Sequence, residues 1–233
     1  MKINSKPFQI VTSKTFRNLT SPHLLSPNQI TWSQQFHSDF HFSWRPIWKN
    51  VWKVPCPQKW NQSYFMLLQR GHPHGDRALR NDLPYPPNYY CPLCPNSTET
   101  LNHIFLECSL AQGLWKWMKR TWKNASGDAP PINLFTVLNG GTFKFSKSIS
   151  QDLLNTTLKI FHRAVIHTLW RARCDLHHGK QVSLIGVLAI LVESIKTCIT
   201  NLHHSNRLKY HILLAARFST LFIIQNNTIT FNF

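Results

Sequence analysis

Apolar residues recur three and four positions apart along most of this chain, a spacing that predicts amphipathic helices. Stripes of this kind predict short helices over residues 44–52, 61–70, 98–105 and 111–123. Gly71 directly follows the second stripe and predicts where that helix ends. Trp, Leu and Phe dominate these stripes, so we expect the helices to bury a core.

The third stripe begins at Thr98, whose side-chain oxygen suits the N-cap of a helix. Glu99 would then lie in the first helical turn, where a negative charge interacts favourably with the helix dipole. If the helix begins there, His103 projects from it one turn further along the chain.

The C-terminal third carries the longest stripe, which predicts a long helix in a small bundle. The apolar positions of this stripe are Leu154, Leu158, Phe161, Val165, Leu169 and Ala172. On its other side, basic residues four positions apart predict a solvated ridge, made of Lys159, Arg163, His167 and Arg171. Further helices are predicted over residues 182–202 and 206–218, and the last residues, ITFNF, suit a short strand or a disordered end.

Composition divides the chain into five segments. Residues 1–43 are rich in Ser, Thr, Asn, Pro and basic residues without a sustained period, so we expect a loosely ordered arm there. The first four stripes fill residues 44–123, and Gly and Pro residues make 124–149 a linker. The predicted bundle then spans residues 150–220, and residues 221–233 form a tail.

Charge changes this picture by pointing to a partner. Lys and Arg outnumber Asp and Glu by 26 to 9, so the formal net charge is +17. A polyanion, and nucleic acid first of all, is the partner that such a charge favours. The alternative is that the charge only keeps the protein in solution, because charge alone speaks to partners and not to fold.

The chain shows no sign of export. The N-terminal residues MKINSKPFQI lack the apolar stretch of a signal peptide, so we expect an intracellular protein that is not secreted. The longest apolar run, residues 182–192, falls short of the roughly 20 residues that span a bilayer and predicts a buried helix, with no membrane partner. Cys56, Cys174 and Cys198 stand apart from one another and are expected to be ordinary buried thiols.

Three other cysteines and one histidine have the spacing of metal ligands. Cys91 and Cys94 are separated by two residues, and His103 and Cys108 follow within the same short run. Pro92 and Pro95 favour a tight turn at the cysteine pair. Three thiolates with one imidazole select zinc over calcium or magnesium, since soft ligands at tetrahedral geometry suit zinc.

Four protein ligands would fill the coordination shell of zinc, so the predicted site is structural and not catalytic. The alternative is that the three cysteines are core thiols and His103 a packed helix residue. Iron–sulfur ligation is a further alternative for the same residues. With the stripes, the motif predicts a mainly α fold class: a small zinc-knuckle helical domain followed by a helical bundle.

The run CPLCPNSTETLNHIFLECSLAQGLWKWM resembles the zinc-binding domain downstream of the polymerase in plant and fungal non-LTR retrotransposon reverse transcriptases. The matching positions are Cys91, Cys94, Glu99, Thr100, His103, residues 104–106, Cys108 and Trp115. Upstream, the residues that resemble the aromatic-rich helices before this motif are Trp48, Trp52, Lys59, Leu67, Leu68 and Gly71.

A second, looser resemblance lies near the C-terminus. The run LWRARCDLHHGK is similar to a Trp-x-x-Arg-Asn segment that often follows this domain, although Cys174 stands where Asn is usual. Together the two resemblances imply a zinc module with a nucleic-acid role, normally one part of a longer retroelement protein. A nuclear location fits such an element.

Basic residues interleaved with aromatic ones supply the candidate contacts to RNA or DNA. One group lies on the fourth predicted helix and consists of Lys116, Trp117, Arg120 and Lys123. Trp115, Met118 and Trp122 share the other face of that helix and are expected in the core. A second group precedes the metal motif and consists of Arg70, His72, His74, Arg77 and Arg80.

The acidic residues argue against catalysis. Polymerase and nuclease sites need clustered carboxylates to hold metal ions, whereas the nine acidic residues here are scattered and no Asp-Asp pair occurs. We therefore expect a non-catalytic module that binds nucleic acid. Two alternatives stay open: an interaction or scaffold module that packs on a reverse transcriptase polymerase domain, and a retroelement remnant without function.

Overall fold

The computed structural model is mainly helical, which confirms the predicted fold class. It describes Trp32 and residues 44–81, 89–140, 143–144, 151–205, 222–225 and 228–231. The helices are α3 (Trp44–Asn50), α4 (Gln58–Leu68), α5 (Gly75–Arg80), η1 (His103–Glu107), α6 (Ser109–Ser126), α7 (Leu134–Leu138), α8 (Gln151–His177) and α9 (Leu184–His204).

The chain separates into two compact units, Met1–Arg45 and Pro46–Phe233. The predicted arm falls in the first unit. The predicted zinc region, linker, bundle and tail fall in the second unit, except for residues 44 and 45 of the zinc region, which belong to the first. Except for Trp32, the arm lies outside the described residues, as do the predicted helix over 206–218 and parts of the linker.

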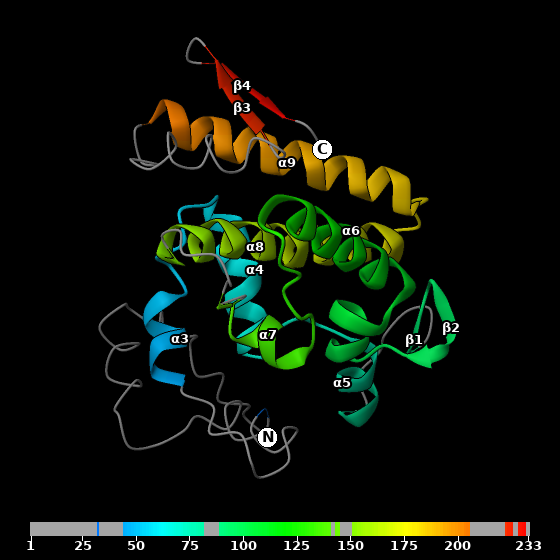
Figure 1. The fold of residues 1–233 in the computed structure, drawn as a ribbon. Helices are drawn as coiled ribbons and strands as arrows, with labels where there is room; N and C mark the ends of the chain where they lie inside the picture. Colours follow the sequence, from blue (N-terminus) through cyan, green and yellow to red (C-terminus); the bar gives the residue numbers. More distant parts are fainter. Residues whose placement is uncertain are drawn as a thin grey trace, which may run out of the picture. The chain divides into compact units, whose positions relative to one another are not determined.

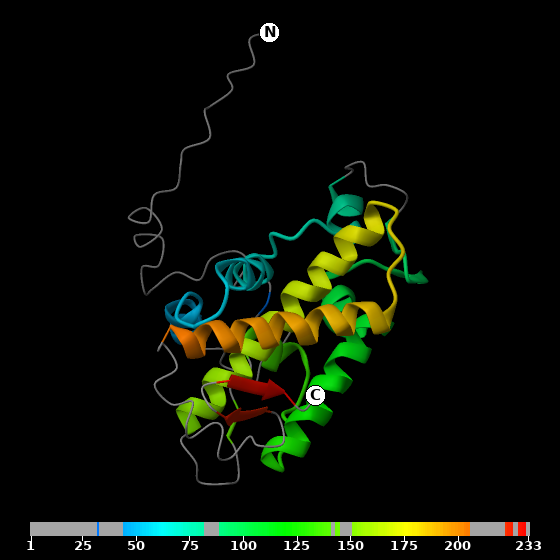
Figure 2. The same cartoon turned by 90° about the horizontal axis from the view of Figure 1, so that it is seen from above.

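Helix α8 is the central element of the second unit (Figure 1). It packs against α4, α9, η1 and α6, and α9 also contacts α6. Figure 2 shows α9 crossing over α8 in a view turned by 90°. The buried apolar face of α8 is formed by Leu154, Leu158, Ile160, Phe161, Ala164, Val165, Ile166, Leu169 and Ala172.

The basic ridge predicted on α8 is wrong in one important respect. Arg163 is only 2% exposed, and Lys159 and His167 are half-buried. The stripe rule assumes that one side of a helix faces water, but α8 is covered on several sides by neighbouring helices. The Arg163 guanidinium carbon instead lies 3.0 Å from the centre of the Tyr64 ring.

Short strands complete the described structure. Strands β1 (Tyr90–Cys91) and β2 (Cys94–Thr98) form an antiparallel hairpin that pairs Cys91 with Cys94. Strands β3 (Phe222–Gln225) and β4 (Thr228–Phe231) form a second antiparallel hairpin near the C-terminus. The prediction of a short strand at ITFNF is therefore confirmed for the residues of β4.

The prediction of a helix that begins at Thr98 is wrong. Thr98 is the last residue of β2, and Glu99 and Thr100 connect it to the helical turn that begins at Leu101. The backbone N–H of His103 donates to Thr100 Oγ1 at 2.9 Å, so Thr100 takes the capping role that Thr98 was expected to have. His103 still projects from a helical turn, as predicted.

Candidate metal centre

The four predicted metal ligands come together in one cluster. Cys91 ends β1 and Cys94 begins β2, so the tight turn between the strands brings both thiols to one side of the hairpin. His103 opens η1 and Cys108 directly follows it. One ligand atom from each of these residues lies within 4.8 Å of all the others.

The sulfur positions match the edges of a zinc tetrahedron. Cys108 Sγ lies 3.9 Å from both Cys91 Sγ and Cys94 Sγ. Zinc–sulfur bonds of ~2.3 Å at tetrahedral angles place two sulfurs about 3.8 Å apart. Disulfide bonds need a much shorter separation of about 2.05 Å, and all three thiols are free.

His103 supplies an independent test of whether the cluster fits a metal. Its side chain is buried, and within the described part of the chain its Nε2 has no hydrogen-bond partner. A buried imidazole nitrogen without a partner is costly, unless a metal ion accepts its lone pair. The donor set and this nitrogen therefore fit zinc, and they argue against the alternative that the cysteines are core thiols.

The helical turn between His103 and Cys108 is wider than an α-helical one. The Cys108 N–H donates to the His103 carbonyl at 2.8 Å, five residues back, which is the hydrogen bond of a π-helix. This turn brings Cys108 back alongside His103, so that both side chains reach the hairpin. The motif spacing of four intervening residues therefore has a local structural explanation.

The cluster also favours a thiolate at one position. Hydrogen bonds from Cys91, and to a smaller extent from Cys94, lower the pKa of Cys108 to about 5, although burial opposes this shift. The Cys91 pKa is raised because its proton is shared with Cys108. A thiolate is the form that binds metal, so the lowered pKa of Cys108 favours metal binding by this sulfur.

Glu99 connects the hairpin to α8, a role that the sequence did not reveal. Its carboxylate is fully buried and accepts two hydrogen bonds from Arg173, from Nε and from Nη2, each at 3.0 Å. His177 Nε2 lies 3.1 Å from the same carboxylate, and the Gly75 N–H donates to it at 3.3 Å. The burial raises the pKa of Glu99, and the hydrogen bonds from His177 and Gly75 lower it.

The environment of this ion pair is aromatic. The Arg173 guanidinium lies 4.8 Å from the centre of the Trp170 ring, and Trp170 lies 4.1 Å from His72. His72 also contacts Phe105 of η1. The Trp-x-x-Arg segment of α8 thus packs beside η1 and the metal cluster.

Gly75 permits the close approach of α5 to the hairpin. A Cβ atom at this position would collide with the Tyr89 carbonyl. Two backbone hydrogen bonds add to this contact. The Asp76 N–H donates to the Glu99 carbonyl at 3.1 Å, and the Glu99 N–H donates to the Tyr89 carbonyl at 2.9 Å. The connector before the motif is therefore part of the same site.

The first group of candidate nucleic-acid residues lies on α6. Lys116, Arg120 and Lys123 are exposed, and Lys119, which was not among the candidates, is exposed beside them. Among the described residues, none of these four cations forms an ion pair with a carboxylate. Trp117 is half-buried, and its ring stacks on Phe161 at 6.3 Å.

The four cations are called the α6 basic face below. Their spacing places them on one side of the helix. Trp115, Met118 and Trp122, on the other side, are buried as predicted.

The second group, before the motif, is less exposed than predicted. His72 and His74 are each 2% exposed, so these two candidates are too buried to contact nucleic acid. His72 Nε2 instead contacts the Ser63 carbonyl at 2.8 Å. Arg70 is half-buried, Arg77 is exposed, and Arg80 is exposed and paired with Asp76 at 2.7 Å.

The remaining cysteines are free, as predicted, but only Cys198 is fully buried. Cys56 and Cys174 are half-buried.

Comparison with known proteins places this site in a family. Residues 28–115 match the family described as zinc-binding in reverse transcriptase. The match includes all four residues of the cluster and ends at Trp115, so this segment is a zinc-binding domain of the reverse-transcriptase type. Neither a curated protein nor a solved structure matches the chain.

Proposed function

We propose that this chain is a zinc-stabilised module from the C-terminal region of a non-LTR retrotransposon reverse transcriptase, and that it binds RNA or DNA without catalysis. The observation that carries the proposal is the α6 basic face, which begins about two helical turns after Cys108, the last residue of the metal cluster. An intracellular, and specifically nuclear, place of action follows from the same proposal.

Zinc would hold the hairpin and η1 together. A bound zinc ion would cross-link the β1–β2 hairpin to η1, and it would supply structural cohesion only. Because the four side chains would occupy every tetrahedral position, no place remains for a reactive water. The protein's own contribution is to position the ligands, through the turn at Cys91 and Cys94 and the π-helical turn that ends at Cys108.

The α6 basic face would contact the phosphate backbone. These exposed lysines and the arginine, which form no ion pair with a carboxylate among the described residues, are available to neutralise phosphates and release counterions. The net charge of +17 would add a long-range attraction for any polyanion.

The first test is the zinc content of the purified chain. We expect one zinc ion per chain, and its loss in Cys91→Ser and in His103→Ala, as measured by elemental analysis. A folded wild-type chain without zinc would contradict the structural part of the proposal.

The second test is the salt dependence of binding to RNA and DNA, measured by fluorescence anisotropy. If all four cations of the α6 basic face contact phosphates, the logarithm of the association constant falls by about 3.6 per tenfold rise in salt on duplex DNA. Each Lys→Gln change on this face should reduce that slope by about 0.9. A salt response near zero would refute nucleic-acid binding.

A second candidate function is a scaffold that packs on a polymerase domain. The observation that favours it lies on α9, where Leu184, Ile185 and Ile190 are 44%, 83% and 62% exposed. By length and composition α9 could also cross a membrane, but a core helix meets the same criteria, and α9 packs on α6 and α8.

An isolated chain that uses α9 as a docking surface should bind a polymerase domain of the same element class and lose that binding in Ile185→Ser. Binding to nucleic acid should be unchanged in this variant. The two candidate functions are therefore distinguishable with one substitution on α9 and one on α6.

A further inference from the structure

A groove of about 530 Å³ opens beside the metal cluster, between η1, α6 and the start of α7. We propose that this groove receives an unpaired base of a single-stranded nucleic acid, while Lys116 and Lys119 hold the adjoining phosphates. The inference rests on the proposed nucleic-acid function and adds to it both a binding mode and a preference for single strands.

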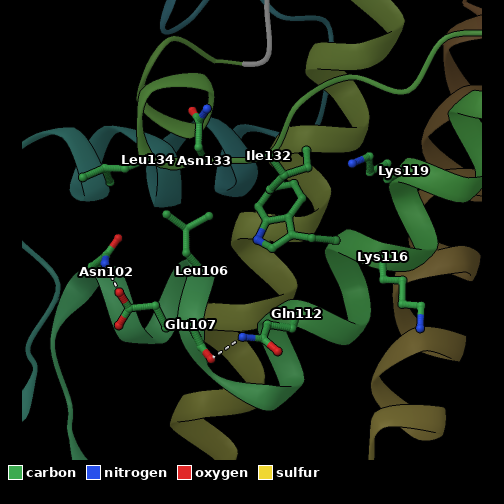
Figure 3. A pocket seen from close by; sticks show the side chains of 10 residues that line it. Asn102, Leu106, Glu107, Gln112, Lys116, Lys119, Ile132, Asn133 and Leu134 are labelled. Carbon is green, nitrogen blue, oxygen red and sulfur yellow. Dashed lines mark hydrogen bonds between the residues drawn. The ribbon is translucent and has the colours of Figure 1, made fainter. Parts of the chain in front are cut away.

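The floor of the groove is apolar. Leu106 of η1, Trp115 of α6, Ile132 and Leu134 line it, and Figure 3 shows Leu106 below the segment that carries Ile132, Asn133 and Leu134. Trp115 is held in place because its Nε1 donates to the Phe105 carbonyl at 2.6 Å. The flat, largely apolar face of a base suits such a floor, and the volume lies in the range of small-molecule sites.

The η1 wall of the groove carries polar groups that are already positioned, and Gln112 of α6 and Asn133 before α7 lie beside it. The Asn102 side chain donates to the Glu107 carboxylate, and Gln112 Nε2 donates to the Glu107 carbonyl at 3.1 Å. Asn133 caps α7 through its contact with the Thr136 N–H at 2.9 Å. Fixed amide and carboxylate groups can bond the edge of a base with little loss of side-chain entropy.

The opposite wall carries the positive charge. Figure 3 shows Lys116 and Lys119 on α6, across the groove from Asn102 and Glu107. Both lysines are exposed, and neither forms an ion pair with a carboxylate in the described part of the chain. The positive charge continues beyond the groove at Arg120 and Lys123, so a strand could follow α6 after its base enters the groove.

The placement of the groove ties it to the metal cluster. Leu106 and Glu107 lie between the ligands His103 and Cys108, and Asn102 directly precedes His103. Ordering of that turn by zinc would therefore order one wall of the groove. An acidic peptide is a less suitable occupant, because Glu107 would repel it and the apolar floor offers its backbone no hydrogen bonds.

A duplex and a single strand differ in one decisive respect. Paired bases are stacked inside a double helix and cannot enter a groove, whereas a base in a single strand is free to do so. Phosphates are present in both. The contribution of the groove is thus measured by removing bases from a strand without removing its phosphates.

The experiment uses the full zinc-loaded chain and labelled oligonucleotides of mixed sequence, as RNA and as DNA. Each is prepared as an intact single strand, as the same strand with abasic positions, and as a duplex. We expect the intact strand to bind about tenfold more tightly than the abasic strand, as loss of base stacking predicts. The duplex should bind no more tightly than the abasic strand.

Ile132→Trp fills the groove and should abolish the tenfold preference for the intact strand, so that intact and abasic strands bind about equally. The zinc content and the binding of the abasic strand should be unchanged. Ile190→Trp is the matched control, since it adds the same side chain on exposed α9 and should keep the preference. If Ile132→Trp fails to fold, Leu134→Trp fills the same floor and takes its place.

The lysines are tested by Lys116→Gln/Lys119→Gln, with Lys49→Gln/Lys53→Gln as a control that removes equal charge from exposed positions elsewhere. The first pair should lower the salt slope on single strands by about 1.4, and the control pair should leave it unchanged.

Equal affinity for intact and abasic strands, or a tighter duplex, would overturn the groove while leaving the proposed function in place. The groove is also refuted if Ile132→Trp and Leu134→Trp both keep the preference for the intact strand. Absence of binding to every oligonucleotide would refute the groove and the proposed function together.

Discussion

The knuckle and the α8–α9 helix pair are held together in different ways. The knuckle, residues 89–108, has two short strands, one π-helical turn and a cluster of metal-binding side chains. Helices α8 and α9 instead bury long rows of apolar side chains against each other and against α4 and α6. The knuckle concentrates its stability in a few specific atoms, whereas the helix pair spreads it over many methyl groups.

This difference follows from the sizes of the elements. An isolated two-stranded hairpin is at best marginally stable in water, so β1 and β2 need an additional constraint. Structural zinc sites supply about 10 to 16 kcal/mol of apparent binding free energy. This exceeds the free energy that so short a segment could gain by burying its apolar side chains. A helix of 27 residues such as α8 needs no such constraint once its faces are packed.

The two regions meet at Glu99 and Arg173. This buried ion pair joins the end of the hairpin to the C-terminal part of α8. The comparison therefore predicts a graded set of responses: loss of a metal ligand affects the knuckle, loss of the ion pair affects the junction, and loss of a methyl group affects the helices only slightly.

The largest effect is expected from Cys108→Ser or from a zinc chelator. Either change should release zinc and remove a free energy on the order of 10 kcal/mol from the knuckle, so that residues 89–108 lose their fixed structure. Helices α8 and α9 should keep most of their amide protection, because most of their packing is against α4, α6 and each other. Hydrogen exchange resolved by segment measures both.

Cys198→Ala is the matched control, since this buried thiol of α9 is not a ligand and its loss should leave the zinc content unchanged. Equal loss of protection in α9 and in the knuckle would show that the two regions unfold as one unit, and would remove the contrast.

The next largest effect is expected at the junction. Glu99→Gln leaves the Arg173 guanidinium, which is 12% exposed, without its charged partner. Breaking a buried pair in this way costs about 3 to 5 kcal/mol of unfolding free energy. Asp76→Asn breaks the exposed pair with Arg80 and should cost about 0 to 1 kcal/mol.

Denaturant unfolding of the two variants measures this difference. A double variant, Glu99→Gln/Arg173→Met, should be more stable than Glu99→Gln alone, because it no longer buries an unpaired charge. A cost below 1 kcal/mol for Glu99→Gln would show that the junction contributes no more than a surface contact.

The two regions also differ in how far their structures could be predicted from sequence. The ligands Cys91, Cys94, His103 and Cys108 were found because their spacing is local and their chemistry specific. Glu99 was placed in a helical turn because its partner, Arg173, is 74 residues away, and no local rule connects them. The Glu-Thr and Trp-x-x-Arg motifs were both visible, but only folding brings them together.

The helices were predicted well in position and less well in exposure. Periodicity places α8 and α9 correctly, since a 3.6-residue repeat reports the local geometry. It cannot report how many neighbours surround a helix, and for this reason Arg163 was expected in solvent. The α9 residues Ile185 and Ile190 show the opposite error, because an apolar run predicted to be buried is partly exposed.

A smaller effect is expected from acid on the helices. Burial, with a further contribution from Arg163, lowers the pKa of His162 to about 3, against an ordinary value near 6.5. Because the folded state resists protonation, its advantage is complete above pH 6.5. As the pH falls from 6.5 towards 3, the stability falls by about 1.4 kcal/mol per pH unit.

His162→Phe should remove this share of the acid sensitivity, while His178→Phe, at an exposed position, should not. The unfolding free energies of both variants and of the wild type are measured at pH 6.5 and 5.5. Because zinc release affects all three proteins alike, the difference between them reports the effect of His162 protonation alone. A slope in His162→Phe equal to that of the wild type would show that this imidazole is protonated in the folded chain.

The smallest effect is expected from a single methyl group in the helix pair. Ile166 of α8 is fully buried, and Ile166→Val removes one methylene from a densely packed site. The expected cost is about 0.5 to 1.5 kcal/mol, with one zinc ion still bound and the hairpin intact. Thermal unfolding, together with the zinc content, measures both quantities. Release of zinc by so small a change in α8 would show that the knuckle depends on helix packing as strongly as on its own ligands, and the contrast between concentrated and distributed stability would then fail.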